Sequence, residues 1–379
     1  MTKHVAPAAV ALVACLLTAC GGGGGGGANP PPPRPPPPTG NVTLSGQVTF
    51  DRPGFTASNT LDFSNLQRLP VRGATLEVLR SSDQSILATS RTGETDGRYS
   101  VTVPAGSVIV RVKAQLQSSG AGGYDFEIRN NTANNALYTL DSAVVNATTG
   151  TTLNLNAAPT GARAAAPFAI LDVFRRAKDL LRGVEPGLGF PPLDVYWSTQ
   201  NRAADCNGRP NPATGEIGTS FFLPVALPAR DGCPAVPAGM YILGDATTPS
   251  ADTDEFDASV IAHEFGHYFE DAFSRADSLG GPHALNWRHD LALAFSEGWG
   301  NAFQGFVLDS PVYRDTFGAT GNASFAFDIE ANSSPFTVET GYFSEASVQE
   351  FLWDVFDPVS AADSDAIDLG YAPIHRVMR

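Results

Sequence analysis

The chain has 379 residues, 42% of them hydrophobic, and a formal net charge of -15. This length allows two folded domains and an unfolded segment. Nucleic acid and anionic membrane surfaces repel so acidic a chain, so we expect no nucleic-acid partner. We expect a monomer.

Residues 1–19 have the composition of an export signal. Lys3 and His4 precede the apolar run Val10–Leu17, and small residues lead to Cys20. Cys20 would follow the cut and carry the lipid, which resembles a bacterial lipoprotein signal; an ordinary signal with an incidental cysteine is the alternative. Because Gly21 follows Cys20, the resemblance implies a cell-envelope protein anchored through Cys20 in the outer membrane or at the cell surface.

Residues 20–40 form a predicted tether. Gly21–Gly27 and the proline run Pro30–Pro38 have no apolar surface to bury and cannot fold into a core. A glycine coil followed by a polyproline rod would hold the folded part away from the anchor.

Residues 41–157 show the period-two alternation of strands. The runs are short and are bounded by Gly, Pro and Asp, which predicts a small antiparallel β-sandwich. They are Val42–Phe50, Ala74–Leu79, Tyr99–Val103 and Val108–Val112. The stretch Thr95–Gly106 resembles the transthyretin-like, carboxypeptidase regulatory-like domain, which carries no catalytic residues and implies a spacer or adhesive module; substrate recognition is the alternative.

Residues 158–379 form the second predicted domain. Apolar residues recur at helical spacing from Ala169 to Arg182. Short strands are predicted at Leu193–Trp197, Thr219–Leu223 and Met240–Leu243, ahead of further helices. Helices mixed with a sheet make this domain α+β.

Two cysteines remain in the predicted exported part. Cys206 and Cys233 lie in stretches rich in Gly, Pro and Asp. In an oxidising compartment we expect them to form a disulfide, because no CxxC spacing indicates a metal site.

The sequence His263-Glu264-Phe265-Gly266-His267 indicates a metal site. Histidines four apart project from one face of a helix and can both bind one Zn²⁺ ion. Glu264 would stand beside the ion and take a proton from the attacking water. Apolar neighbours make burial of these side chains without a metal costly.

Glu297 is the expected third ligand. A three-histidine motif would need glycine at Glu270 and histidine at Phe273 and is excluded. His283, His289 and Asp290 are alternatives, but they lie in a polar, turn-rich stretch, whereas Glu297 follows the apolar run Leu291–Phe295. Gly298 and Gly300 weaken this helix, which suggests close packing against the helix of His263.

These motifs resemble those of the gluzincin metallopeptidases, closest to the fungalysin and thermolysin group. The residues are HEFGH at 263–267, SEGWGNAF at 296–303 and the stretch Gly341–Asp354. The resemblance implies an α+β metallopeptidase domain, with a mixed sheet, the HExxH helix and a helical part, preceded by a small all-β sandwich. Where the group usually has an aspartate that orients the first histidine, this chain has Asn301, whose amide oxygen can accept the imidazole N–H.

The resemblance also implies a donor for the oxyanion, placed before a late helix. Tyr342 precedes the helical run Glu345–Phe356 and is the first choice, with His375 second; a surface or core role for Tyr342 is the alternative. Similarity to thermolysin makes Thr219–Phe222 the edge strand on which a peptide lies.

The sequence therefore predicts a surface-anchored zinc endopeptidase acting on protein or peptide substrates with one catalytic Zn²⁺ ion. A catalytically silent binding or adhesion lipoprotein that keeps the metal site is the alternative. A third hypothesis is that the helical part forming the far wall of the cleft is incomplete at its C-terminus, because the chain stops in the helix-like run Pro373–Arg379.

Overall fold

The computed structural model describes residues 40–247, 251–331, 340–358 and 366–379. These residues belong to one compact unit, Pro38–Arg379. The predicted signal, the tether and Cys20 lie outside the described residues.

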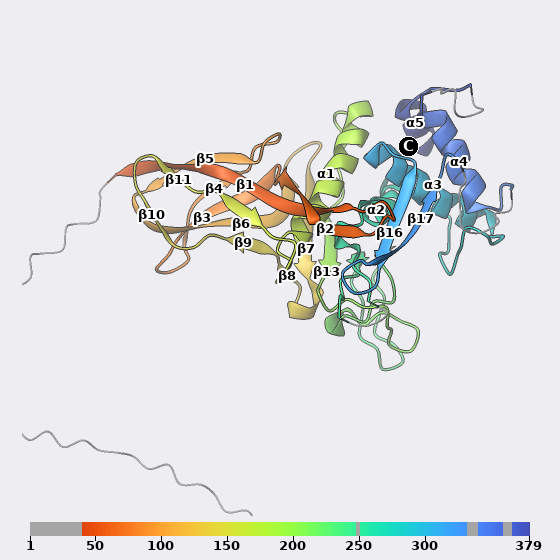
Figure 1. The fold of residues 1–379 in the computed structure, drawn as a ribbon, viewed down its shortest axis with the longest axis horizontal. Helices are drawn as coiled ribbons and strands as arrows, with labels where there is room; N and C mark the ends of the chain where they lie inside the picture. The colour runs from red at the N-terminus through yellow and green to blue at the C-terminus, as the bar shows by residue number, and fades with distance from the viewer. Residues whose placement is uncertain (1–39, 248–250, 332–339, 359–365) are drawn as a thin grey trace, which may run out of the picture. The chain divides into compact units, whose positions relative to one another are not determined.

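The N-terminal half of the unit is built of strands (Figure 1). Alternation explains them: along β5 the burial pattern runs exposed, buried, exposed, so that Tyr99, Val101 and Val103 face the core. The strands are β1 (Asn41–Phe55), β2 (Leu61–Pro70), β3 (Ala74–Arg80), β4 (Ile86–Arg91), β5 (Arg98–Pro104), β6 (Gly106–Ser118), β7 (Tyr124–Asn130), β8 (Ala136–Leu137), β9 (Thr139–Asp141), β10 (Val145–Ala147), β11 (Thr151–Thr152) and β12 (Leu155–Ala157).

The C-terminal half contributes five α-helices and five strands within the described residues. Where the sequence predicts helices at Ala169–Arg182, around HEFGH and at Glu345–Phe356, the structure has α1, α2 and α4. The elements are α1 (Ala166–Val184), β13 (Leu193–Trp197), β14 (Phe221–Leu223), β15 (Gly239–Ile242), α2 (Ala258–Phe273), α3 (Leu291–Leu308), β16 (Val312–Phe317), β17 (Ala323–Asp328), α4 (Glu345–Phe356) and α5 (Tyr371–Met378).

One large sheet joins the two halves. A sheet of ten strands has the main order β14-β15-β13-β7-β6-β3-β4, and β13 pairs in parallel with β7 from Leu193 opposite Phe126 to Tyr196 opposite Arg129. A second sheet of five strands is organised around β1, which pairs with β2, β5, β11 and β12. β16 and β17 form a separate antiparallel pair.

The predicted fold class is therefore wrong. The expectation was an α+β peptidase domain with its own mixed sheet, preceded by a separate β-sandwich. In the structure the strands β13, β15 and β14 extend the sheet of the N-terminal half across residue 157, and the described chain is predominantly β. Period-two patterns locate strands but carry no information on which strand pairs with which, so the continuous sheet could not be predicted.

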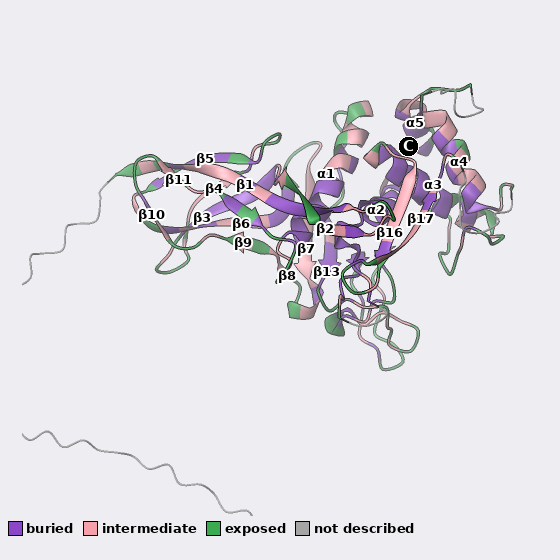
Figure 2. Ribbon diagram, in the orientation of Figure 1, coloured by how far each residue is buried: buried purple, intermediate pink, exposed green. Residues whose placement is uncertain are grey.

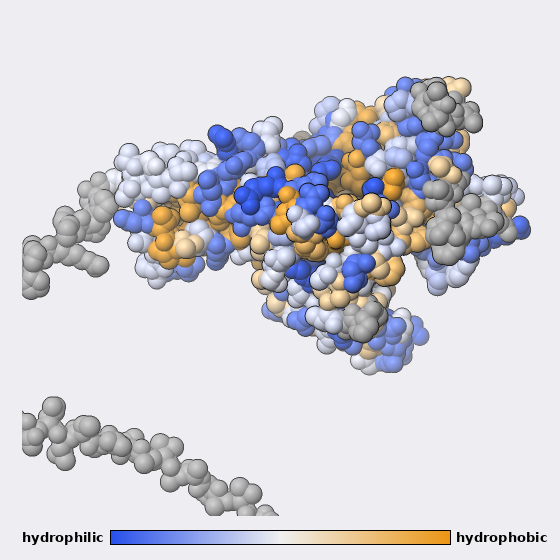
Figure 3. Space-filling view, in the orientation of Figure 1, coloured by the Kyte–Doolittle hydropathy of each residue, from blue (hydrophilic) through white to orange (hydrophobic). Residues whose placement is uncertain are grey.

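The helices bury their apolar faces against this sheet and against one another. α2 packs between α1 and α3, and buried residues lie along all three helices (Figure 2). Aromatic rings fill the contact: Phe265 of α2 meets Phe126 of β7 edge to face with centroids 5.9 Å apart, and Phe174 of α1 at 5.0 Å. Around β2 the surface is hydrophilic (Figure 3), in agreement with the exposed residues of that strand. α2 is therefore held on several sides by the core.

Candidate metal centre

Helix α2 presents His263 and His267 to a common point. The two side chains come from successive turns of one face, and their Nε2 atoms lie 3.0 Å apart. His263 is only 6% exposed, so its position is fixed by packing. One cation can therefore contact both imidazoles.

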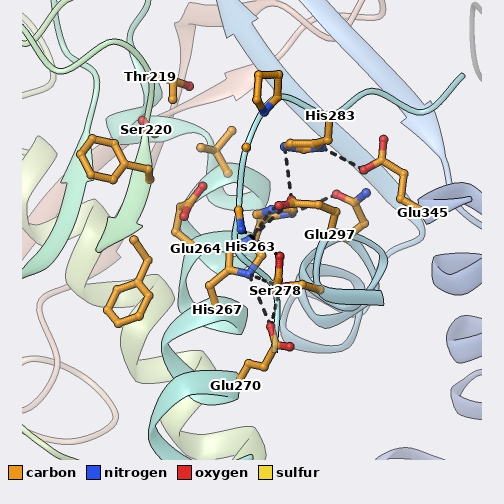
Figure 4. Close-up of a pocket in the computed structure, with 18 of the residues that line it drawn as sticks. Thr219, Ser220, His263, Glu264, His267, Glu270, Ser278, His283, Glu297 and Glu345 are labelled. Atoms are coloured by element: carbon orange, nitrogen blue, oxygen red, sulfur yellow. Dashed lines mark hydrogen bonds and ion pairs between the residues drawn. The ribbon is translucent and has the colours of Figure 1, made fainter. Parts of the chain in front are cut away.

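Helix α3 brings Glu297 to the same point (Figure 4). Its Oε2 atom lies 3.3 Å from His263 Nε2 and 3.5 Å from His267 Nε2. Two ligands of a tetrahedral zinc ion with bonds of 2.0–2.1 Å lie roughly 3.3–3.4 Å apart. The two distances to Glu297 match this separation, and the two Nε2 atoms, 3.0 Å apart, are slightly closer together than a zinc ion would hold them.

The unpaired polar atoms of the site also fit a metal. Glu297 Oε2 is buried without a hydrogen-bond partner. His263 Nδ1 lies 2.9 Å from the amide oxygen of Asn301, so it donates and leaves Nε2 free for a ligand. His267 Nδ1 is occupied similarly, with Ser296 Oγ at 3.3 Å and Glu270 Oε2 at 3.8 Å. A cation between the two Nε2 atoms and Glu297 would satisfy all three.

The charge at this point favours a cation. Burial disfavours the protonated imidazole of His267, but the nearby carboxylates of Glu270 and Glu297 outweigh it and raise the pKa of His267 to about 10. Burial likewise acts against the carboxylate of Glu297, but the nearby rings of His263 and His267 hold its pKa well below the ordinary value. The negative charge that retains a proton here would also retain a metal ion.

The glycines of α3 make room for His263. A Cβ atom at Gly300 would lie 2.7–2.9 Å from three atoms of the His263 ring, and one at Gly266 would lie 3.2 Å from Gly300 Cα. The close helix contact expected from Gly300 is therefore present. Gly298 serves a different contact, because its Cβ would meet Val348 and the carbonyl oxygen of Glu345.

Glu264 lines a cavity of about 920 Å³ together with the three candidate ligands. It is 8% exposed, and its side chain lies on the side of the cavity toward Ser220 (Figure 4). Strand β14 forms part of the wall, and in the described residues it pairs with β15 alone. The candidate base and an edge strand therefore open onto the same space.

His283, one of the alternative third ligands, also lines this cavity, and 37% of its side chain is exposed. Its Nε2 atom lies 3.3 Å from Glu297 Oε2, and its Nδ1 atom lies 2.9 Å from Glu345 Oε2 (Figure 4). Glu345 is 1% exposed at the start of α4. Sequence reasoning missed this pair because nothing in a turn-rich stretch indicates that it folds back over α3.

The two residues expected to donate to the oxyanion lie elsewhere. Tyr342 is 76% exposed and packs against Phe343, and it does not line the cavity. His375 is buried and lies 3.1 Å from a Glu185 carboxylate oxygen through its Nε2 atom. Tyr342 was chosen because it precedes the late helix α4. It does precede that helix, but its side chain points to solvent.

The predicted disulfide between Cys206 and Cys233 is present. It closes the irregular excursion between β13 and β15, where a small apolar cluster includes Val236 and Tyr241. The bond lies outside the cavity, so its role is structural.

Comparisons with known proteins give no family for the chain. No family model and no curated protein matches it. Among solved structures, a DUF3823 family protein from Parabacteroides merdae ATCC 43184 is similar at 14% identity and a TM-score of 0.17, over 31% of this chain and 46% of its own. A candidate carbohydrate-binding protein from Pseudomonas aeruginosa is similar at 9% identity and a TM-score of 0.18, over 31% of this chain and 89% of its own. This chain thus spans about half of the first structure.

These comparisons correct the expected relationship. Two of the similar solved structures are a DUF3823 family protein and a candidate carbohydrate-binding protein, neither of them described as a gluzincin peptidase. The predicted membership of that group, with its regulatory-like N-terminal domain, is wrong. At such TM-scores the two structures assign no function to the chain. The chemistry of the site must be argued from its own side chains.

Proposed function

We propose that the chain is a zinc-dependent endopeptidase. The observation that carries the proposal is the convergence of His263, His267 and Glu297 at zinc spacing on one wall of a cavity that Glu264 also lines. A zinc ion held there would act as a Lewis acid on a peptide carbonyl and lower the pKa of water.

The side chains around the ligands can supply the proton transfers. Glu264 neighbours His263 in α2 but is not part of the ligand group, so its carboxylate remains available as a base. It would accept the proton of the attacking water and pass it to the leaving amine. Asn301 and Ser296 would keep the two imidazoles in the tautomer that presents Nε2 to the metal.

His283 is the donor that the geometry favours for the oxyanion. Glu345 holds its Nδ1 atom, so Nε2 carries a donor hydrogen when the ring is protonated and points toward the ligand Glu297. A hydrogen bond aimed at the place where negative charge develops stabilises the transition state. His283 takes over the role that the sequence had suggested for Tyr342.

The walls of the cavity fit an extended peptide. β14 is an edge strand that can pair with a peptide backbone, and its own residues Phe222 and Leu223 line the cavity and offer apolar contact. A cavity of about 920 Å³ is large enough for several side chains of a substrate. We therefore propose protein or peptide substrates cut within the chain.

Cleavage of casein by the full chain tests this function. The zinc-loaded protein should cleave casein, and the chelator 1,10-phenanthroline should stop the reaction. Glu264→Gln should keep its zinc and lose activity by about a hundredfold or more, because only the base is removed. Glu94→Gln, a change to an exposed carboxylate paired with Arg175, is the matched control and should remain active. Unchanged cleavage by Glu264→Gln would exclude the mechanism, and zinc binding without cleavage would favour a binding protein.

We also propose that the chain is attached to the bacterial outer membrane or cell surface through lipid on Cys20. Within the described residues, none of the helices has the length and apolar character needed to cross a bilayer. The support is the sequence around Cys20, with its basic start, short apolar run and small residues before the cysteine. Cys20→Ser should move the protein from the membrane fraction to the soluble fraction; an unchanged distribution would reject the anchor.

A further inference from the structure

Three aspartates meet at the start of α2, apart from the residues of the metal centre, and a fourth, Asp257, is near enough to interact with their charges. Asp252, Asp254 and Asp315 each place a carboxylate oxygen within 4.8 Å of the others. Asp257 is the N-cap residue of α2, and its strongest charge interaction is with Asp315. Three of the four precede α2 in the chain, and Asp315 comes from β16.

Backbone and side-chain contacts fix the positions of these aspartates. The backbone N–H of Gly318, just beyond β16, donates to Ala251 O at 2.6 Å. Asp257 Oδ2 accepts hydrogen bonds from Thr316, from the backbone N at 2.7 Å and from Oγ1 at 2.8 Å. Asp254 Oδ2 accepts a hydrogen bond from Ser220. The cluster is thus preformed rather than a chance meeting of flexible side chains.

Each of the four carboxylates has one oxygen without a partner. The Oδ1 atoms of Asp252, Asp254, Asp257 and Asp315 are all buried and form no hydrogen bond, and neither does Thr253 Oγ1. Asp257 is 0% exposed and Asp254 is 3% exposed. Buried polar atoms without partners are rare in proteins and are commonly explained by a bound ion or water.

No cation of the protein neutralises the group in the part of the chain that the structure describes. Arg52 interacts with Asp257 through its charge. Its Nη2 atom donates its hydrogen bond to the carbonyl oxygen of Phe256 instead of to the carboxylate. Burial, and then the charges of the neighbouring aspartates, raises the pKa of Asp254 and Asp257 well above the ordinary value. Uncompensated carboxylates at this spacing would destabilise the fold.

We propose that Asp252, Asp254 and Asp315, with the charge of Asp257 nearby, bind a divalent cation of the calcium class. All of the ligands in this group are oxygen atoms, which a hard cation such as Ca²⁺ prefers. Zinc sites usually include imidazole or thiolate ligands, and this group has neither. A calcium ion with oxygen ligands at 2.3–2.6 Å fits a group whose oxygens lie within 4.8 Å of one another.

The cation would tie the start of α2 to β16. It would lie beside the cavity, since Asp252, Asp254 and Asp315 line its wall, but it shares no residue with the zinc ligands. Tyr313 of β16 is near both groups: its ring packs against His263 with centroids 6.1 Å apart, and the charge of Asp315 acts on its hydroxyl. The cation would therefore support the helix that carries His263 and His267. This inference does not depend on proteolysis.

Calcium binding by the full chain tests the inference. The protein is loaded with zinc, freed of other metals and titrated with CaCl₂ by calorimetry, and its thermal unfolding is followed with and without calcium. We expect one Ca²⁺ ion per chain with a Kd of about 10⁻³ M or tighter, and a midpoint of unfolding that rises with calcium. Absence of both effects up to about 10 mM calcium, well above that Kd, would overturn the inference.

Variants locate the site. Asp315→Asn and, independently, Asp252→Asn should each weaken calcium binding at least tenfold while the zinc content stays the same. Asp368→Asn, a change to an exposed aspartate far along the chain near α5, is the matched control and should bind calcium as the parent does. Equal affinity in Asp315→Asn, Asp252→Asn and Asp368→Asn would overturn the inference, and so would a second zinc ion that blocks calcium.

Discussion

At the scale of single residues, the candidate metal centre depends on what surrounds its ligands. The histidines and Glu297 could be named from HExxH and a downstream carboxylate, because ligand chemistry restricts residue type and helical spacing. The orienting amide of Asn301 could also be anticipated and lies 2.9 Å from His263 Nδ1. His283 could be named only as an alternative ligand, and its contact with Glu345 could not be foreseen, because it depends on how a loop returns over α3.

Replacing His283 with Gln should slow catalysis without loss of zinc. The change replaces the imidazole, which can donate as a cation, with a neutral amide of different shape, and we expect kcat to fall by about 10²–10³ with KM nearly unchanged. Tyr342→Phe is the comparison, because Tyr342 is exposed and should tolerate the change. The measurement is steady-state cleavage of a quenched peptide with zinc content determined in parallel. A loss of activity in Tyr342→Phe but not in His283→Gln would contradict the assignment.

Replacing Gly300 with Ala should weaken zinc binding. The added Cβ would come within 2.7–2.9 Å of the His263 ring and force the ring to move. Displacing a ligand's support usually costs about 10–100-fold in metal affinity. The matched change is Gly183→Ala in α1, where the added Cβ meets nothing within 4 Å and zinc affinity should be unaffected. Competition with a fluorescent zinc chelator measures both, and equal affinities would refute the steric account.

At the scale of secondary-structure elements, the periodic segments were predictable, and so was the short strand Leu193–Trp197, but one hairpin was not. Residues 169–182 have an apolar stripe that required a helix, and α1 spans Ala166–Val184. The hairpin of β16 and β17 was missed, although Tyr313 and Phe327 stack across it with centroids 4.8 Å apart. Its residues alternate weakly, and its pairing is stabilised by tertiary contacts that local propensity does not record.

The end of α1 and helix α5 are joined by a cluster that should respond to acid. Hydrogen bonds from Arg379 and His375 lower the pKa of Glu185 to about 2, below its value in an unfolded chain. Because the folded pKa is depressed, the stabilisation is complete above the unfolded pKa and is lost as the pH falls toward 2.

The change Glu185→Gln isolates this contribution. The variant should unfold at a lower temperature than the parent at neutral pH, and the difference should shrink as the pH is lowered from about 4.5 toward 2. Thermal melts of both proteins at several pH values, followed by circular dichroism, measure it. A difference that stays constant with pH would show that the cluster does not act through ionisation of Glu185.

At the scale of the whole molecule, the sequence misled where pairing over long distances decides the architecture. Two patterns of residue spacing suggested two domains, but β7 and β13 pair and make one sheet of ten strands. Register and partner choice are set by the assembled core, in which Phe126 of β7 meets rings from α1 and α2. The resemblance drawn from the motifs was wrong for the same reason, because the motifs describe a site and not the scaffold that holds it.

The central claim is that two imidazoles and one carboxylate hold a single zinc ion, and X-ray absorption at the zinc edge tests it most directly. The zinc-loaded full chain should show a first shell of nitrogen and oxygen atoms at about 2.0–2.1 Å, with the outer-shell scattering of two imidazole rings and no sulfur. Because Asn301 and Ser296 contact the Nδ1 atoms of His263 and His267, we expect both rings to bind zinc through Nε2. A first shell of oxygen alone, or an unchanged spectrum after His263 and His267 are replaced by alanine, would contradict the account.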